Sequence, residues 1–433
     1  MTITIYTYIF SLFFILHNGI ETVLEILQIN YLKNRGDKVP SHLEGKVDLD
    51  TIRKSALYNI EKLKFGLFMR FIDTAILIFS ITFAFNFIDS WVRSFGLNSI
   101  LTGVLFIVVL SAASLIISLP SSIYHTFVIE QKWGFNRQTG LSFTGDLIKE
   151  TLIGAVIILP LLALILKIMD STPYWWILAW GVISIFQIVM MWLYPAVIMP
   201  MFNKFEKIEG ELENEAQKLS DKTMFPLKAV YKMDGSKRSA HSNAFITGFG
   251  NSKRIVLFDT LIEKLETSQL MAVLAHELGH YKLGHIKKRL IITTILGVAV
   301  FALFGLSSLQ TDLYKGLGFN ETSNWAALIV FNLFFGEIAF PAGFISRYFS
   351  RKDEYAADRF AVLTVKNGYD LKDSLIALGT QNMSSPGSHK WFRGWYNSHP
   401  SLRERIKAIK LIEENENFNP KADSDKRNDV EQT

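Results

Sequence analysis

The chain has 433 residues, of which 49% are hydrophobic and 20% charged, and its formal net charge is +5. The apolar residues gather into runs long enough to cross a bilayer, which takes about 20 residues per helix, so a string of soluble domains is disfavoured. The absence of cysteine excludes cysteine-ligated zinc, haem-thiolate and iron–sulfur sites. Any metal must therefore be held by His, Asp or Glu.

The N-terminal apolar run lacks the basic segment that opens a secretory signal, because no Lys or Arg precedes Lys33. We interpret this run as a retained membrane helix. Hydropathy along the chain predicts seven membrane helices in all, at about 3–27, 65–88, 99–119, 151–169, 174–199, 290–308 and 325–346.

Three of these spans carry ionisable residues. They are His17, Glu21 and Glu25 in the first span, Arg70 and Asp73 in the second, and Glu337 in the seventh. Such groups at membrane depth usually face a bundle interior or a watery cavity. For Arg70, a side chain that reaches back to the membrane surface is an equally good interpretation.

Basic residues alternate between the loops. They are frequent in 31–64, in 120–150 and between the fifth and sixth helices, and sparse in 92–98 and 309–324. Since basic loops stay on the cytoplasmic side, the alternation predicts an outer N-terminus and an inner C-terminus.

Two polar regions then lie on the inner side. The first combines a charged helical stretch, three short strands and an amphipathic helix, with the strands at 229–233, 244–247 and 254–258. The second is helical and ends in a tail with few apolar residues, which we expect to be disordered. The chain thus divides into 1–202 with five membrane helices, 203–289, 290–346 with two more, 347–412 and the tail 413–433.

The amphipathic helix contains the pattern HExxH. His276 and His280 are four residues apart and therefore share one helical face, with Glu277 beside them. This arrangement is typical of metal-activated hydrolysis, and two chance histidines on an ordinary helix are a poor alternative. Thr267 or Ser268 is the expected N-cap of the helix.

A catalytic zinc needs a third protein ligand and one open position. The metzincin pattern fails, because Leu283 and Ile286 stand where it requires glycine and histidine, and His285 is expected to hydrogen-bond at the surface. The alternative is a glutamate from a later helix. Glu354 fits as the ligand, with Asp358 one turn later to orient an imidazole. Alone, this charged stretch would be typical of a solvated helix start.

Five segments together resemble the type I CAAX prenyl proteases, seven-helix zinc endopeptidases that trim prenylated protein C-termini. The segments are 127–136, 243–248, 275–280, 354–358 and 398–405. With the helix count, the resemblance extends from about residue 20 to residue 412. It implies a mainly α, polytopic membrane protein with seven transmembrane helices and a small α+β zinc metalloprotease domain on the cytoplasmic side.

The resemblance also implies roles for individual residues. One zinc ion per chain would be held by His276, His280 and Glu354, with Glu277 as general base. His399 and Arg405 would stabilise the oxyanion or hold the substrate. By its residues alone, a histidine before a proline is more often part of a turn. The edge strand that would pair with the peptide backbone contains Asn243, Ala244 and Phe245.

We therefore expect an integral, multi-pass endopeptidase of a bacterial inner membrane or the endoplasmic reticulum, with its active site at the cytoplasmic face. Its substrate would be a CAAX-type peptide or protein, prenylated or not, and the alternative is membrane-protein quality control without prenyl specificity. We expect a monomer in the lipid bilayer and no nucleic-acid partner. Two rival hypotheses are a site-2-type protease, which the charges flanking the zinc helix disfavour, and a transporter or scaffold without zinc.

Overall fold

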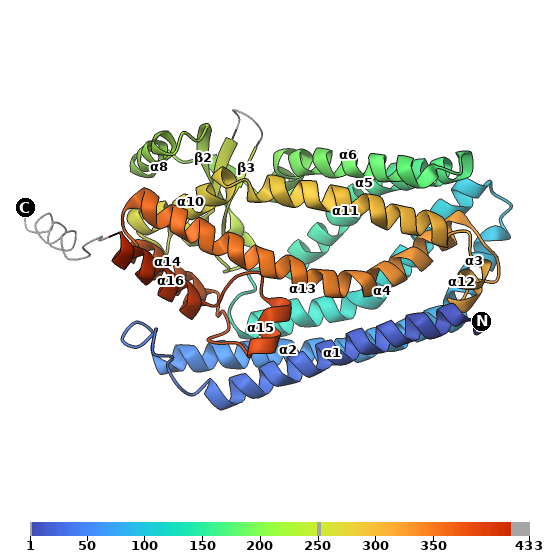
Figure 1. Ribbon diagram of the computed structural model, residues 1–433, viewed down its shortest axis with the longest axis horizontal. Coiled ribbons are helices and arrows are strands. Elements are labelled where there is room, and N and C mark those ends of the chain that lie inside the picture. The colour runs from blue at the N-terminus through green and yellow to red at the C-terminus, as the bar shows by residue number, and fades with distance from the viewer. Residues whose placement is uncertain (1, 249–252, 417–433) are drawn as a thin grey trace, which may run out of the picture.

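The computed structural model describes residues 2–248 and 253–416. Long helices run side by side along its longest axis, and a small sheet with shorter helices lies at the end opposite the N-terminus (Figure 1). Among the described residues, seven helices are long and apolar enough to span a membrane, which confirms the predicted number. They are Ile5–Arg35, Leu49–Arg93, Ser99–Glu130, Gly140–Ser171, Trp175–Phe202, His285–Ser307 and Asn324–Val365.

The spanning helices are longer than the predicted spans, because hydropathy detects only the apolar part of each. Three of them contain short π-helical turns, at Ser80–Ala84, His125–Glu130 and Tyr194–Ile198. The α-helical parts of the seven spans are α1 Ile5–Arg35, α2 Leu49–Phe79, α3 Phe85–Arg93, α4 Ser99–Tyr124, α5 Gly140–Ser171, α6 Trp175–Leu193, α7 Met199–Phe202, α11 His285–Ser307 and α13 Asn324–Val365.

Helix α13 has 42 residues and carries both the last membrane span and the region of the expected third metal ligand. Neither glycine nor proline occurs between Phe344 and Val365, so nothing in the sequence ends the helix at the membrane surface. The predicted boundary between residues 346 and 347 thus lies inside one continuous helix.

The sheet has four strands in the order β1-β2-β4-β3, with β2 and β4 parallel and the other two pairs antiparallel. Its strands are β1 Phe205–Lys207, β2 Leu227–Met233, β3 Ala244–Thr247 and β4 Lys253–Phe258. The three predicted strands are confirmed. The first was missed, since three residues show no alternation, and β3 lies at an edge of the sheet.

The remaining helices are α8 Glu211–Lys222, α9 Asp259–Ile262, α10 Thr267–Lys282, α12 Thr311–Gly316, α14 Tyr369–Gln381, α15 Lys390–Tyr396 and α16 Leu402–Asn415. Helices α8, α9, α10, α14 and α16 share a core with the sheet. In contrast, α12 packs on α1 and α13 at the end with the N-terminus, and α15 also packs on α1 and α13 (Figure 1). The N-cap of α10 is Glu266 and not Thr267 or Ser268, and its backbone N–H donates to Gln269 Oε1 at 3.2 Å. The predicted tail lies outside the described residues except for its first four, which belong to or directly follow α16.

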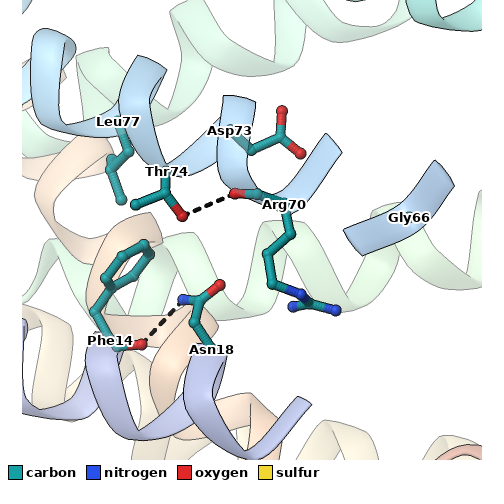
Figure 2. Close-up of a pocket in the computed structure, with 7 residues that line it drawn as sticks. All are labelled: Phe14, Asn18, Gly66, Arg70, Asp73, Thr74 and Leu77. Carbon is teal, nitrogen blue, oxygen red and sulfur yellow. Dashed lines mark hydrogen bonds between the residues drawn. The ribbon is translucent and has the colours of Figure 1, made fainter. Parts of the chain in front are cut away.

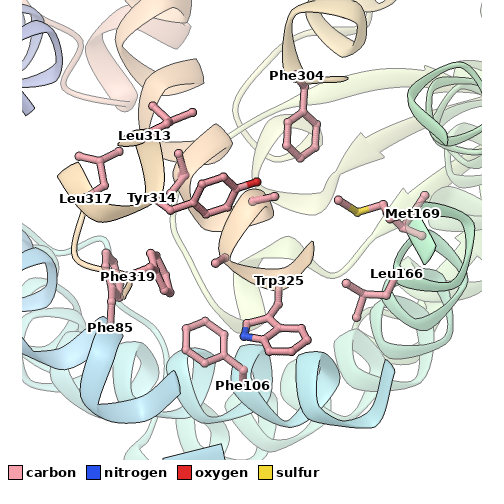
Figure 3. Close-up of a cluster of buried hydrophobic side chains, with 14 of the residues drawn as sticks. Phe85, Phe106, Leu166, Met169, Phe304, Leu313, Tyr314, Leu317, Phe319 and Trp325 are labelled. Atoms are coloured by element: carbon pink, nitrogen blue, oxygen red, sulfur yellow. The ribbon is translucent and has the colours of Figure 1, made fainter. Parts of the chain in front are cut away.

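Two hydrophobic cores stabilise the two ends of the molecule. The membrane core gathers aromatic and aliphatic side chains from all seven spanning helices, from α12 and from the segment that follows it, including Phe106, Phe319 and Trp325 (Figure 3). The second core joins β2 and β4 to α10, α13, α14 and α16. Four consecutive α10 residues, Ala272 to Ala275, belong to it, so the helix with the HExxH pattern is fixed by packing on several sides.

Helices α10 and α13 are in close backbone contact at Gly279. A Cβ atom added there would lie 3.1 Å from Ala357 Cα and 3.2 Å from Ala357 O. A Cβ at this position would therefore require α13 to move by a few tenths of an ångström, and glycine avoids that shift. Gly279 precedes His280 directly, and Ala357 lies between Glu354 and Asp358 in the sequence, so the contact sets the distance between the two halves of the expected site.

We predict that Gly279→Ala destabilises the protein by about 1–3 kcal/mol through overpacking and also weakens metal binding, because it pushes α13 away from α10. Thermal unfolding in detergent and titration with zinc would measure the two effects. The control is Gly336→Ala in α13, where an added Cβ meets nothing within 4 Å. That variant should be as stable as the wild type or more so, since alanine favours helix; equal melting temperatures for both variants would contradict the prediction.

Candidate metal centre

The structure brings His276, His280 and Glu354 together. The two Nε2 atoms are 3.1 Å apart, and they lie 3.4 and 3.3 Å from the two carboxylate oxygens of Glu354. The histidines come from successive turns of α10 and the carboxylate from α13. All three side chains offer one ligand atom within 4.8 Å of the others.

These distances fit a tetrahedral zinc site. With zinc–nitrogen bonds of about 2.0–2.1 Å, neighbouring ligand atoms are about 3.3–3.4 Å apart. In addition, Glu354 Oε2 is buried and has no hydrogen-bond partner among the described residues. A buried carboxylate oxygen without a partner is costly, and a bound cation would satisfy it. Three protein ligands leave one position open, as catalytic zinc requires.

Asp358 and Arg405 fix the ring of His276 from behind. His276 Nδ1 lies 2.9 Å from Asp358 Oδ1, and Arg405 donates to both oxygens of Asp358 at 2.8 and 2.6 Å. All three side chains are buried. A carboxylate that holds the second ring nitrogen fixes the tautomer in which Nε2 is free for a metal. This is the geometry expected of Asp358 from the sequence.

The ring of His280 has a corresponding partner in His285, which the sequence analysis missed. The two Nδ1 atoms lie 2.9 Å apart, and His285 Nε2 is 3.6 Å from Asp353 Oδ1. The prediction that His285 hydrogen-bonds at the surface is wrong, because this residue is buried. Gly284, at φ +69°, ends one helix and starts the next, and so turns His285 back toward His280.

Glu277 lies between the ligands in the sequence and is partly buried. Burial raises the pKa of its carboxyl group, whereas the neighbouring His276 and His280 lower it. A carboxylate shifted toward neutrality is a better proton acceptor at neutral pH than an exposed one.

His399 reaches the same site from the segment before α16. Its Nε2 lies 3.3 Å from Glu354 Oε1, and its Nδ1 lies 2.9 Å from Ser398 Oγ. Its side chain is 63% exposed, so it faces open space beside the ligands. Helix α16 is anchored next to it, since Ser401 caps the helix and Arg405 holds Asp358.

Strand β3, the expected partner of the substrate peptide, lies next to helix α10. Ala244 and Ile246 of β3 pack on the core that contains α10, and Asn243 directly precedes the strand. Strand β3 pairs with β4 on one side, and no strand covers its other side within residues 2–248 and 253–416. It is therefore an edge strand, the kind of strand to which an extended peptide can add.

Polar contacts link the ionisable residues of α1 and α2 to α15, which precedes His399 in the chain. Arg70 of α2 pairs with Glu21 and lies 2.6 Å from Glu25, so it faces the helix bundle and not the membrane surface. Together with Phe14, Asn18 and Asp73, it lines a pocket of about 300 Å³ between α1 and α2 (Figure 2). Tyr396 Oη donates to Glu21 at 3.0 Å. The polar network thus extends from the bilayer to a tyrosine three residues before His399.

Comparison with known proteins decides the family. A family model described as CAAX prenyl protease N-terminal, five membrane helices, matches residues 28–204, and the model of peptidase family M48 matches residues 206–413. The chain belongs to the CAAX prenyl protease family of M48 peptidases. It is thus a membrane metalloendopeptidase, as the resemblance implied.

Several relatives of this M48 peptidase cover nearly its whole length. The CAAX prenyl protease 1 homolog of Arabidopsis thaliana is 36% identical, over 90% of this chain and 94% of the relative. CAAX prenyl protease 1 of Saccharomyces cerevisiae is 34% identical, over 89% and 91%. The crystal structure of S. mikatae Ste24p is similar with a TM-score of 0.86 and 32% identity, over 94% of this chain and 100% of that one.

We predict that His285→Ala weakens zinc binding roughly 10–100-fold, because His280 loses the partner that fixes its ring. Competition with a fluorescent zinc chelator would measure the affinity without any need for activity. His285→Gln should retain part of the affinity, since its amide oxygen can also accept a hydrogen bond. The control is His125→Ala, in the π-helical turn after α4, because the partner of this histidine is Glu130 and not a ligand of the candidate site. A wild-type affinity in His285→Ala would contradict the role of the His280–His285 contact.

Proposed function

We propose that this M48 peptidase is a zinc endopeptidase that cleaves near the C-terminus of CAAX-type proteins, with prenylated substrates preferred. The observation that carries the proposal is the triangle of His276, His280 and Glu354 with the partly buried Glu277 beside it. The substrate class is supported by relatives named CAAX prenyl protease, which match the chain over about nine tenths of its length.

The three ligands would hold the metal, and the remaining groups transfer protons and stabilise charge. Zinc, when bound, supplies a Lewis acid that polarises the scissile carbonyl and makes water a better nucleophile near neutral pH. Glu277 accepts the proton of the attacking water as the oxygen bonds to the carbonyl carbon. It then donates this proton to the leaving amine nitrogen as the C–N bond breaks.

Other residues stabilise charge or hold the ligands. His399 is exposed beside Glu354 and is therefore placed to donate to the developing oxyanion. Arg405 is buried against Asp358 and 3.4 Å from His276 Nδ1, so we assign it mainly to positioning the ligand ring. Its Nη1 also lies 3.7 Å from Glu354, which adds positive charge next to the site.

Substrate binding follows from the free edge of β3. An extended peptide would add to this edge by backbone hydrogen bonds, with Asn243, Ala244 and Phe245 alongside it. Such pairing depends little on side chains and would accept several sequences. The enzyme is proposed to act as a monomer, with its metal centre on the cytoplasmic side where the basic loops lie.

The zinc helix itself argues for this class of protease. Helix α10 is not among the seven helices able to span a membrane in the described part of the chain, and it packs against the sheet. A site-2-type protease would instead place its HExxH pattern within a spanning helix. The metal centre is therefore proposed to lie at the membrane surface, where water and peptide reach it.

We predict that Glu277→Gln lowers peptide cleavage at least 100-fold while zinc remains bound, because the variant keeps all three ligands and loses the proton acceptor. The assay compares a farnesylated CAAX peptide with its unprenylated counterpart. Glu263→Gln, at an exposed position before the same helix, is the control and should be fully active. Equal cleavage of both peptides would support quality control without prenyl specificity, and an active Glu277→Gln would refute the assignment of the base.

We further predict that removal of the metal with 1,10-phenanthroline abolishes cleavage and that added zinc restores it, because the ligand triangle cannot activate water alone. Removal should also lower the melting temperature, since the metal binds only the folded state. Thermal unfolding with and without the chelator measures this second effect. Full activity in protein shown to be metal-free would overturn the proposal.

A further inference from the structure

A large cavity opens next to the metal centre. It has a volume of about 1160 Å³ and lies between the end of α1, the α1–α2 connection, α14 and the segment that joins α15 to α16. In Figure 1 these elements meet at the end of the molecule where the connection from α1 to α2 runs below α16. His399 and Arg405 belong to its wall, so the cavity adjoins the site of cleavage.

The charges around this cavity have one sign. Four cationic side chains line it, namely Arg35, Lys38, Arg393 and Arg403, in addition to Arg405. No Asp or Glu is present among the described residues of its lining. We refer to it as the basic cavity.

A basic loop beside a membrane is common, so the placement of the charges within the loop matters. Three ion pairs lie in or next to the same stretch, and none of their cations lines the cavity. The pairs are Arg53 with Asp37 at 2.8 Å, Lys54 with Asp50 at 2.7 Å and Lys46 with Asp373. In contrast, Arg35, Lys38 and Arg403 have no ion pair within residues 2–248 and 253–416. Three of the cations that line the cavity are thus unpaired, whereas Arg393 lies 3.3 Å from Glu404 and Arg405 pairs with Asp358.

One residue of the lining, His42, has a buried polar atom without a partner. His42 Nδ1 is inaccessible to solvent and makes no hydrogen bond to the residues that the structure describes. The rest of the lining includes aliphatic side chains, among them Leu43, Ile52, Leu375 and Leu402. Apolar walls with a few unpaired cations fit a ligand that has aliphatic side chains and one anionic group.

We propose that the basic cavity binds the C-terminal carboxylate of the peptide substrate, with Arg35, Lys38 and Arg403 as its cationic partners. The inference rests on the proposed function and deepens it. The three residues that follow the cleaved bond span about 10 Å when extended, and they end in a carboxylate. A chain leaving the metal centre past His399 enters the cavity, where its aliphatic side chains meet the apolar wall and its carboxylate meets the cations.

With this arrangement, the carboxylate reaches the cations only when the cleaved bond lies about three residues before the C-terminus of the substrate. A free carboxylate forms charge-assisted hydrogen bonds with arginine, whereas an amidated C-terminus leaves the cations without a partner. The cavity therefore selects substrates that are cut close to their C-terminus, and this selection needs no contact with the lipid or the cysteine.

Binding tests the proposal independently of catalysis. The probe is a fluorescent, farnesylated Cys-Val-Ile-Met peptide, made once with a free carboxylate and once with a C-terminal amide. Anisotropy with full-length, zinc-loaded Glu277→Gln protein in detergent measures both affinities. We expect the carboxylate form to bind about tenfold more tightly or better, and the difference to shrink at high salt.

Variants of the cavity then identify the partners. In the same Glu277→Gln background, Arg403→Gln and Arg35→Gln should weaken the carboxylate peptide about tenfold and leave the amide peptide unchanged. Lys54→Gln, an exposed cation of α2 paired with Asp50, is the matched control and should change neither affinity.

The outcomes separate this inference from the proposed function. Equal affinities for both peptides would overturn the carboxylate site, and cleavage of both by the wild type would leave the protease assignment intact. Conversely, selective binding of the carboxylate form without any cleavage by the wild type would uphold the cavity and refute the proposed activity. Loss of both affinities in Arg403→Gln would point to a general structural effect and contradict a carboxylate contact at this position.

Discussion

The packing of α10 against α13 at Gly279 and Ala357 is the constraint on which the metal centre depends. It places two imidazoles from one helix within 3.4 Å of a carboxylate from another. Burial of such a carboxylate is unfavourable unless partners surround it. His280, His399 and Arg405 lie within 4 Å of this carboxylate, and a bound cation would satisfy its remaining oxygen. The imidazoles are fixed in turn, since Asp358 holds His276 and His285 holds His280. The site is therefore preorganised by packing and by hydrogen bonds at the same time.

The C-terminal segment is held from two directions. Arg405 of α16 ties it to the ligands, and Tyr396 ties it to Glu21 inside the membrane helices. Gln28 of α1 also bonds to the backbone of this segment, with His389 N–H donating to its side chain at 2.8 Å. The membrane part and the metal centre are thus joined by named contacts as well as by the chain.

Local chemistry made part of this structure predictable from the sequence. The apolar runs predicted the membrane helices. The four-residue spacings of His276 and His280 and of Glu354 and Asp358 predicted that each pair lies on one helical face. The role of His285 required knowledge of a turn at Gly284 that reverses the chain, and the short strand β1 required its partner β2. The basic cavity assembles residues separated by more than 350 positions, such as Arg35 and Arg403, which no local pattern can bring together.

Helix α13 is continuous from the last membrane span to Glu354, and it bends along its course, with Pro341 in its membrane part (Figure 1). At 1.5 Å per residue its 42 residues measure about 63 Å, roughly twice the thickness of the hydrocarbon layer. A spanning helix adjusts its tilt to the thickness of the surrounding bilayer. Because Glu354 lies on the same helix, a change of tilt transmitted past Pro341 would move this carboxylate relative to the histidines of α10. The thickness of the surrounding bilayer would then act on the geometry of the candidate metal centre without any lipid touching it.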